Sequence, residues 1–104
     1  MKTTIAGVVC LGFFVVTAGS AAAANAGNGE VLAKRWCASC HVVSADQRHG
    51  STEAAPFSEM AKQPGFDAAR LALFLLAPHP PMPDMSLSRA EAADLAAYIK
   101  MQGK

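Results

Sequence analysis

Two cysteines separated by two residues, with a histidine directly after the second, constrain this chain more than any other feature. They are Cys37, Cys40 and His41 in the segment Cys-Ala-Ser-Cys-His. A disulfide between them would close too short a loop to stabilise a domain. A thioredoxin-like dithiol is expected beside alternating strands and helices, and a structural zinc ion needs four ligands. The sequence contains neither that strand pattern nor a second cysteine pair, so another chemistry is indicated.

The same five residues match the covalent attachment of haem. Each thiol adds across one haem vinyl group to form a thioether, and two intervening residues let one turn of chain present both sulfurs to the same side of the ring. The histidine follows at once, where its imidazole reaches the iron, and histidine is a standard proximal ligand. The motif therefore predicts one covalent haem c, attached to Cys37 and Cys40, with His41 as the proximal iron ligand.

The first quarter of the chain is typical of a secretory signal peptide. Lys2 precedes an uncharged apolar run over residues 5–16, and small residues follow it. Two Ala-x-Ala segments place cleavage after Ala24 or after Ala26. The apolar run is shorter than the roughly 20 residues that span a bilayer, so no stable membrane insertion is expected. We predict a signal peptide over residues 1–26, one domain over residues 27–104 and a periplasmic location.

The mature chain is small and electrically balanced. Lys2 is the only charged residue in the predicted signal peptide, so eight of the nine basic side chains remain against eight acidic ones. This balance gives no case for a nucleic-acid partner. A chain of roughly 80 residues is short for a self-sufficient core, and a cofactor that fills the interior is expected on that ground as well.

Three segments of the mature chain have apolar residues at helical spacing, and no strand pattern follows residue 27. The first expected helix begins at Asn28 or Gly29, with Asn28 as its cap, and runs to Cys40. The second covers residues 68–76. The third follows a capping box that begins at Ser88. The sequence therefore predicts an all-α fold.

The segments between these helices are long and irregular. A polar loop is expected over residues 44–55, and a short helical turn over residues 57–62. Four prolines among residues 78–83 exclude both helix and strand there and predict a stiff, extended loop. Three to four helices joined by long loops are therefore expected.

With these features in place, the mature region resembles the class I c-type cytochromes of the small bacterial monohaem type. The resemblance rests on the haem motif, on Gly29 eight residues before it, and on a tail that contains Met82, Pro83, Leu87, Leu95 and Tyr98. The family often has an aromatic residue where this chain has Ala33. The resemblance implies the cytochrome c fold, in which three to four helices and long loops wrap around one covalent haem.

The resemblance also implies a methionine as the second axial iron ligand. Met82 is favoured over Met85, which lies where the family often has an apolar packing residue. Met60 and Met101 fall in helical segments and are expected to pack in the core. His79 is the alternative ligand, and ligation by it would give a bis-histidine haem with a lower potential.

Two further roles around the haem are implied. The family uses a proline carbonyl to accept the second ring N–H of the proximal histidine, and Pro56 is the matching residue for His41. The alternative for Pro56 is that it only begins a helix. The haem propionates need donors or solvent, and the candidate donors are Gln47, Arg48, Lys62 and Arg70.

A six-coordinate iron leaves no open position for a substrate, so the resemblance implies an electron carrier and not an enzyme. We expect a monomer that works with redox partner proteins, between a dehydrogenase or quinol-oxidising complex and a terminal oxidase or similar acceptor. Two alternatives stay open. One is a haem subunit bound to a specific dehydrogenase complex, and the other is an open-coordination haem enzyme or ligand sensor.

Overall fold

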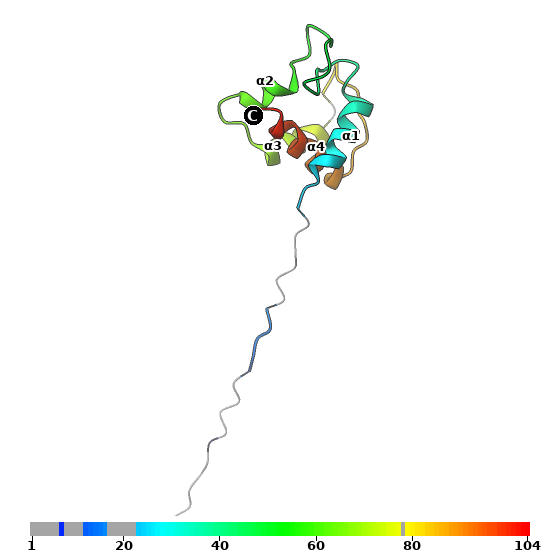
Figure 1. The fold of residues 1–104 in the computed structure, drawn as a ribbon. Helices are drawn as coiled ribbons and strands as arrows, with labels where there is room; N and C mark the ends of the chain where they lie inside the picture. The colour runs from blue at the N-terminus through cyan, green and yellow to red at the C-terminus, as the bar shows by residue number, and fades with distance from the viewer. Residues whose placement is uncertain (1–6, 8–11, 17–22, 78) are drawn as a thin grey trace, which may run out of the picture.

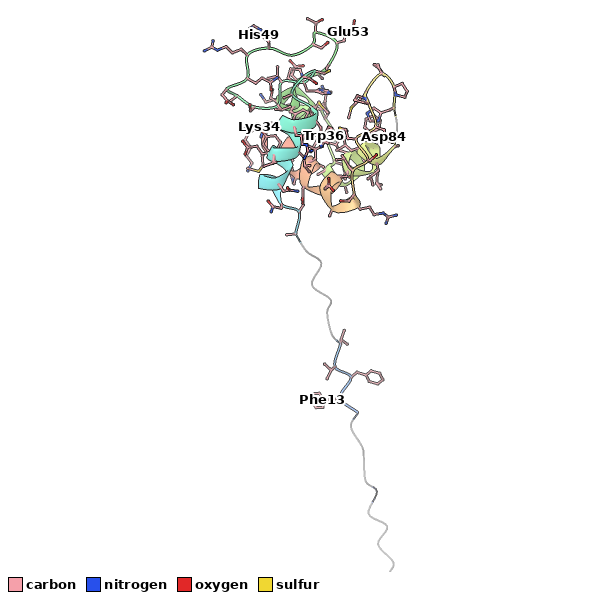
Figure 2. All side chains as sticks on the ribbon, turned by 90° about the vertical axis from the view of Figure 1, so that its right-hand side faces the viewer. Phe13, Lys34, Trp36, His49, Glu53 and Asp84 are labelled. Carbon is pink, nitrogen blue, oxygen red and sulfur yellow. The ribbon has the colours of Figure 1, made fainter. Side chains whose placement is uncertain are left out.

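A computed structural model of the chain describes residues 7, 12–16, 23–77 and 79–104. These residues form four helices and no strand, namely α1 (Ala26–Trp36), α2 (Phe57–Lys62), α3 (Ala68–Leu76) and α4 (Arg89–Met101) (Figure 1). The predicted all-α fold is confirmed for this part of the chain. Most of the predicted signal peptide, including Lys2, lies outside the described residues, as does Pro78. Where it is described, Phe13 is 92% exposed (Figure 2).

Helix α4 is the centre of the fold because it packs against each of the other three helices (Figure 1). Its predicted capping residue is confirmed, since the Ser88 side chain accepts a hydrogen bond from the Glu91 N–H at 3.1 Å. Burial of each large apolar side chain contributes roughly 1.5–3 kcal/mol. The helix buries one stripe, which consists of Ala92, Leu95, Ala96, Tyr98 and Ile99.

No helix among the described residues is both long and apolar enough to cross a membrane.

Helix α1 begins and ends earlier than expected. Its cap is Asn25, whose side chain accepts a hydrogen bond from the N–H of Asn28 at 3.0 Å. Asn28, the expected cap, lies in the first turn and uses its side-chain amide to donate to Asp94 of α4 at 2.9 Å. The helix ends at Trp36, and Cys37 is its C-cap. The prediction that it continues to Cys40 is wrong because the haem motif forms a series of turns.

Helices α1 and α4 cross closely at Gly29, which is buried. A Cβ atom at this position would overlap the backbone carbonyl of Asp94 and would lie only 2.8 Å from the Cβ of Tyr98. Because the obstacle is the backbone of a packed helix, it cannot move aside as a flexible side chain would. The absence of a side chain at Gly29 therefore sets the distance between the two helices.

Replacing Gly29 with alanine should destabilise the protein by about 3 kcal/mol or more, at the upper end of overpacking costs. Gly27→Ala is the matched control on the same helix, because its Cβ would meet only the Asn25 side chain, at 3.2 Å. Alanine is the better helix former, so the control should stay within about 1 kcal/mol of the parent. Guanidinium unfolding of both variants measures the difference. Equal effects at the two glycines would contradict the close crossing.

Helices α2 and α3 form the other side of the domain and match their expected positions. The side chain of Asp67 accepts a hydrogen bond from the Arg70 N–H at 3.1 Å and caps α3. Pro56 precedes α2, and Phe57 in its first turn is only 2% exposed. The chain then returns from α3 to α4 through residues 77–88. The loop after α1, the pair α2 and α3, and this returning loop surround a hollow.

Candidate functional site

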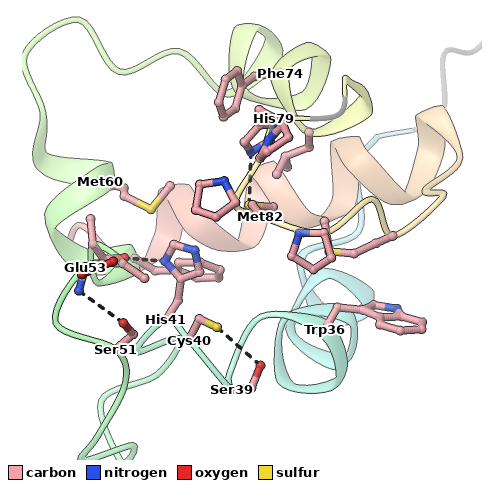
Figure 3. Close-up of a pocket in the computed structure, with 18 of the residues that line it drawn as sticks. Trp36, Ser39, Cys40, His41, Ser51, Glu53, Met60, Phe74, His79 and Met82 are labelled. Carbon is pink, nitrogen blue, oxygen red and sulfur yellow. Dashed lines mark hydrogen bonds between the residues drawn. The ribbon is translucent and has the colours of Figure 1, made fainter.

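A cavity of about 450 Å³ occupies this hollow (Figure 3). One wall is formed by the residues that follow α1, and these include Cys40 and His41. The facing wall is the loop between α3 and α4, which we call the proline-rich loop and which carries Met82 and Met85. Apolar side chains form most of the remaining lining, among them Phe57 from α2. Residues that the sequence separates by some 40 positions are thus brought to one place.

Backbone hydrogen bonds fold the Cys-x-x-Cys-His segment into a tight turn. The N–H groups of Cys40 and His41 both donate to the carbonyl of Cys37, at 3.1 and 2.8 Å. Cys40 is exposed on the cavity wall, whereas Cys37 is only 5% exposed and packs in the core beside it. Burial raises the pKa of the Cys37 thiol to about 11. No disulfide joins Cys37 to Cys40, so both sulfurs are available for thioether bonds.

The imidazole of His41 is oriented by a backbone carbonyl and an aromatic ring. Its Nδ1–H donates to the carbonyl of Ala55 at 2.6 Å, and the ring lies 5.5 Å from the buried ring of Phe57. A carbonyl only accepts hydrogen bonds, so the proton must sit on Nδ1, and Nε2 keeps the lone pair that binds metals. The predicted acceptor, Pro56, is one residue off. The Pro56 carbonyl accepts instead from the N–H groups of Glu59 and Met60, because Pro56 is the N-cap of α2.

Three methionines line the cavity, namely Met60, Met82 and Met85. Met82 lies on the side that faces the His41 ring (Figure 3). Met60, from α2, also packs against the hydrophobic core, as expected. Met101 is away from the cavity lining and is 51% exposed on α4, so its expected packing role in the core is wrong.

His79, the alternative ligand, is held by its own surroundings. Its Nδ1–H donates to the Ala77 carbonyl at 2.8 Å, and its ring stacks on Phe74 with 3.9 Å between the ring centroids. Its Nε2 lies 3.2 Å from the sulfur of Met82. These contacts place the imidazole against α3 and next to the methionine. His49, by contrast, is exposed on the outer loop (Figure 2).

Comparison with known proteins gives one clear relative. The chain is 52% identical over 92 residues to cytochrome c-552 of Bradyrhizobium diazoefficiens, and the match covers 88% of each chain. The chain belongs to the small bacterial monohaem c-type cytochromes. No family model and no solved structure matches it. The predicted family and its cofactor, covalent haem c, are thereby confirmed, and so is the prediction of an electron carrier that is not an enzyme.

The residues around the cavity of this cytochrome fit that cofactor. A thiol and an imidazole with an available Nε2 lie together on one wall, and soft thioether sulfurs lie on the other. Imidazole and thioether are the donors that haem iron accepts in electron carriers. The lining between them is mainly apolar, as the faces of a porphyrin require. When bound, the haem supplies the one-electron redox chemistry, and the chain supplies the ligands and the environment.

Gln47 organises the haem motif of this cytochrome, a role that the sequence did not indicate. Its side-chain oxygen accepts from the Val43 N–H at 3.0 Å. Its amide nitrogen lies 2.9, 2.8 and 2.9 Å from the carbonyls of Ala38, His41 and His49. An amide carries two hydrogens, so these three carbonyls share them. Gln47, one of the four candidate propionate donors, is therefore already engaged in the loop, and the exposed candidates that remain are Arg48, Lys62 and Arg70.

Replacing Gln47 with alanine should destabilise the haem-loaded protein by about 1–3 kcal/mol, because the Val43 N–H and the carbonyls around it lose their partner. Thr52→Ala at an exposed position of the same loop is the control and should change stability by no more than about 0.5 kcal/mol. Guanidinium unfolding, followed through the haem absorbance, measures both. If the two variants unfold at the same concentration, Gln47 does not organise the loop.

Proposed function

We propose that this cytochrome is an exported one-electron carrier whose haem is attached at Cys37 and Cys40 and whose iron lies between His41 and Met82. It takes electrons from a dehydrogenase or quinol-oxidising complex and delivers them to a terminal oxidase or similar acceptor in the periplasm. The observation that carries the proposal is the cavity that has His41 on one wall and Met82 on the facing wall.

His41 suits the role of a fixed proximal ligand. The Ala55 carbonyl holds the proton on Nδ1, which leaves the Nε2 lone pair free to bind iron. Phe57 packs beside the ring, and Phe57 in turn lies edge-on to Tyr98 of α4, with 6.4 Å between the ring centroids. The hydroxyl of Tyr98 donates to the Val43 carbonyl at 2.7 Å. The ligand is thus tied to the central helix through packed side chains.

Met82 suits the role of the distal ligand for two reasons. A thioether is a soft donor that favours ferrous over ferric iron and so raises the reduction potential. The stiff proline-rich loop holds this weak ligand at a low entropic cost, and the Met82 N–H donates to the His79 carbonyl at 3.2 Å. Occupation of the last coordination position excludes other ligands, which favours a carrier over a sensor. Met85, farther along the same loop, is the competing sulfur.

The rim of the cavity offers a surface where electrons enter and leave. Trp36 and Phe74 line the cavity and are 43% and 53% exposed. Charges of both signs lie at this surface, since the Arg35 guanidinium lies 4.9 Å from the centre of the Trp36 ring and Glu53 lines the cavity. The charges of the mature chain balance, so long-range electrostatic steering of redox partners is expected to be weak.

Spectroscopy and native purification test the proposal together. The oxidised protein should show the near-infrared charge-transfer band of methionine bound to ferric haem iron, and the reduced protein should bind carbon monoxide only slowly. Absence of that band with rapid carbon monoxide binding would favour the open-coordination enzyme or sensor. Purification as a stable complex with a dehydrogenase, with no free pool, would favour the subunit.

A further inference from the structure

Asp94 of α4 binds the start of α1 through both of its carboxylate oxygens. One oxygen accepts from the backbone N–H of Asn25 at 2.7 Å, and the other accepts from the side-chain amide of Asn28 at 2.9 Å. Asn25 is at the same time the cap of α1, and its carbonyl accepts from the Gly29 N–H at 3.0 Å. The backbone nitrogen of Asn25 is thus a defined point of the α1–α4 contact.

The two possible cleavage positions differ sharply in what they leave of this contact. Cleavage after Ala26 removes Asn25, and with it the cap of α1, one partner of Asp94 and the acceptor of the Gly29 N–H. Loss of an asparagine cap alone weakens a helix measurably. Cleavage after Ala24 keeps every one of these groups and converts the Asn25 nitrogen into the terminal amino group.

We infer that the chain is processed between Ala24 and Asn25 and that the new terminal ammonium group of Asn25 pairs with Asp94. This inference rests on the proposed export. Hydrolysis of the Ala24–Asn25 peptide bond consumes one water, leaves a carboxylate on the departing segment and frees an amino group that takes up a proton at neutral pH.

The carboxylate of Asp94 would compensate the positive charge that cleavage creates at the Asn25 nitrogen. A positive charge at the start of a helix is unfavourable because the helix dipole is positive there. The carboxylate already lies 2.7 Å from the nitrogen that would carry the charge, so a hydrogen bond from a neutral amide becomes an ion pair in the same geometry. Asp94 thereby links the mature N-terminus to the central helix.

The first test identifies the N-terminal residue of the haem-loaded protein purified from the periplasm, by N-terminal sequencing and intact mass. Asparagine as the first residue is expected. A chain that begins at Gly27 overturns the inference. So does a chain that begins at any other residue or is not cleaved. The haem adduct in the mass and the visible spectrum are read from the same sample, so a failure of the proposed electron-carrier function is seen separately.

The second test measures the interaction energy between Asp94 and the Asn25 ammonium group with a thermodynamic cycle of four proteins. Asp94→Asn is introduced into the chain that begins at Asn25 and into a chain exported by another signal peptide so that Ala23 and Ala24 stay attached. In the extended chain the Asn25 nitrogen is an uncharged amide. Asp94→Asn should raise the unfolding equilibrium constant by an additional factor of about 3–10 in the chain that begins at Asn25. Equal effects in both chains overturn the ion pair.

Asp84 provides the control for this cycle. Its exposed carboxylate lies on the proline-rich loop and accepts from the Ser86 N–H at 2.9 Å (Figure 2). Asp84→Asn should change the unfolding equilibrium by the same factor in both chains. A difference there as large as the one at Asp94 would mean that the extension acts on the whole fold, and that would overturn the assignment to Asp94.

Discussion

Replacement of both Cys37 and Cys40 by alanine should abolish the fold together with haem attachment. The haem-free chain would have to enclose a cavity of about 450 Å³. At about 24 cal/mol per Å³, an empty cavity of this size costs up to about 11 kcal/mol, an upper limit because one side opens to solvent. A mature domain of roughly 80 residues has a total stability of about 4–12 kcal/mol. Even a part of this cost is comparable with the whole stability, so the unfolded state should dominate.

Far-UV circular dichroism of the purified double variant measures this outcome. We expect most of the helical signal and the cooperative thermal transition to be lost at 25 °C. Ser39→Ala, between the two cysteines, is the control, because Ser39 is exposed and its hydroxyl contacts only the Cys40 sulfur, at 3.8 Å. This variant should keep both haem and helices. A cooperative unfolding transition in the haem-free double variant would show that the haem is dispensable for folding.

Replacement of Met82 by alanine should remove the distal ligand while the haem stays attached. The oxidised variant is expected to lose the near-infrared charge-transfer band, and the reduced variant to bind carbon monoxide rapidly. The reduction potential should fall by on the order of 0.1 V, within the range of about 0.8 V that axial ligands span. The cause is the loss of a soft sulfur donor that stabilises ferrous iron.

Met85→Ala is the matched comparison, because Met85 lines the same cavity from the same loop. It should keep the band and the potential and lose only packing, at a cost of about 1–3 kcal/mol. His79→Ala tests the other candidate ligand and should also keep the band. Loss of the band in the Met85 variant alone would assign the ligand to Met85, and loss in the His79 variant alone would show that the ligand depends on this imidazole.

Local signals in the sequence predicted most helix positions correctly. The caps of α3 and α4, Asp67 and Ser88, each bond to an N–H group three residues along the chain, so they can be recognised without knowledge of the fold. The start of α1 was different. Two asparagines three residues apart can both cap a helix, and the choice of Asn25 depends on Asp94, which binds both of them from α4. A contact over more than 60 residues leaves no local trace.

The residues of the candidate site also fall into those that local sequence predicts and those that depend on the fold. The haem motif can be recognised from its own residues, and Met82 and Met85 were recognised as candidate ligands through their loop. The acceptor for the His41 ring was missed by one residue, because the helix that starts after Pro56 takes up that carbonyl. The role of Gln47 depends on irregular backbone turns up to nine residues away, and no residue pattern indicates it.

Intact mass and absorbance of the exported protein test the central claim most directly. Under denaturing conditions the mass should equal the processed chain plus one haem, because thioethers to Cys37 and Cys40 survive unfolding. The native oxidised protein should show the near-infrared band of a methionine-ligated iron. A haem that separates from the unfolded chain, or a native spectrum without that band, would contradict a covalent haem held between His41 and Met82.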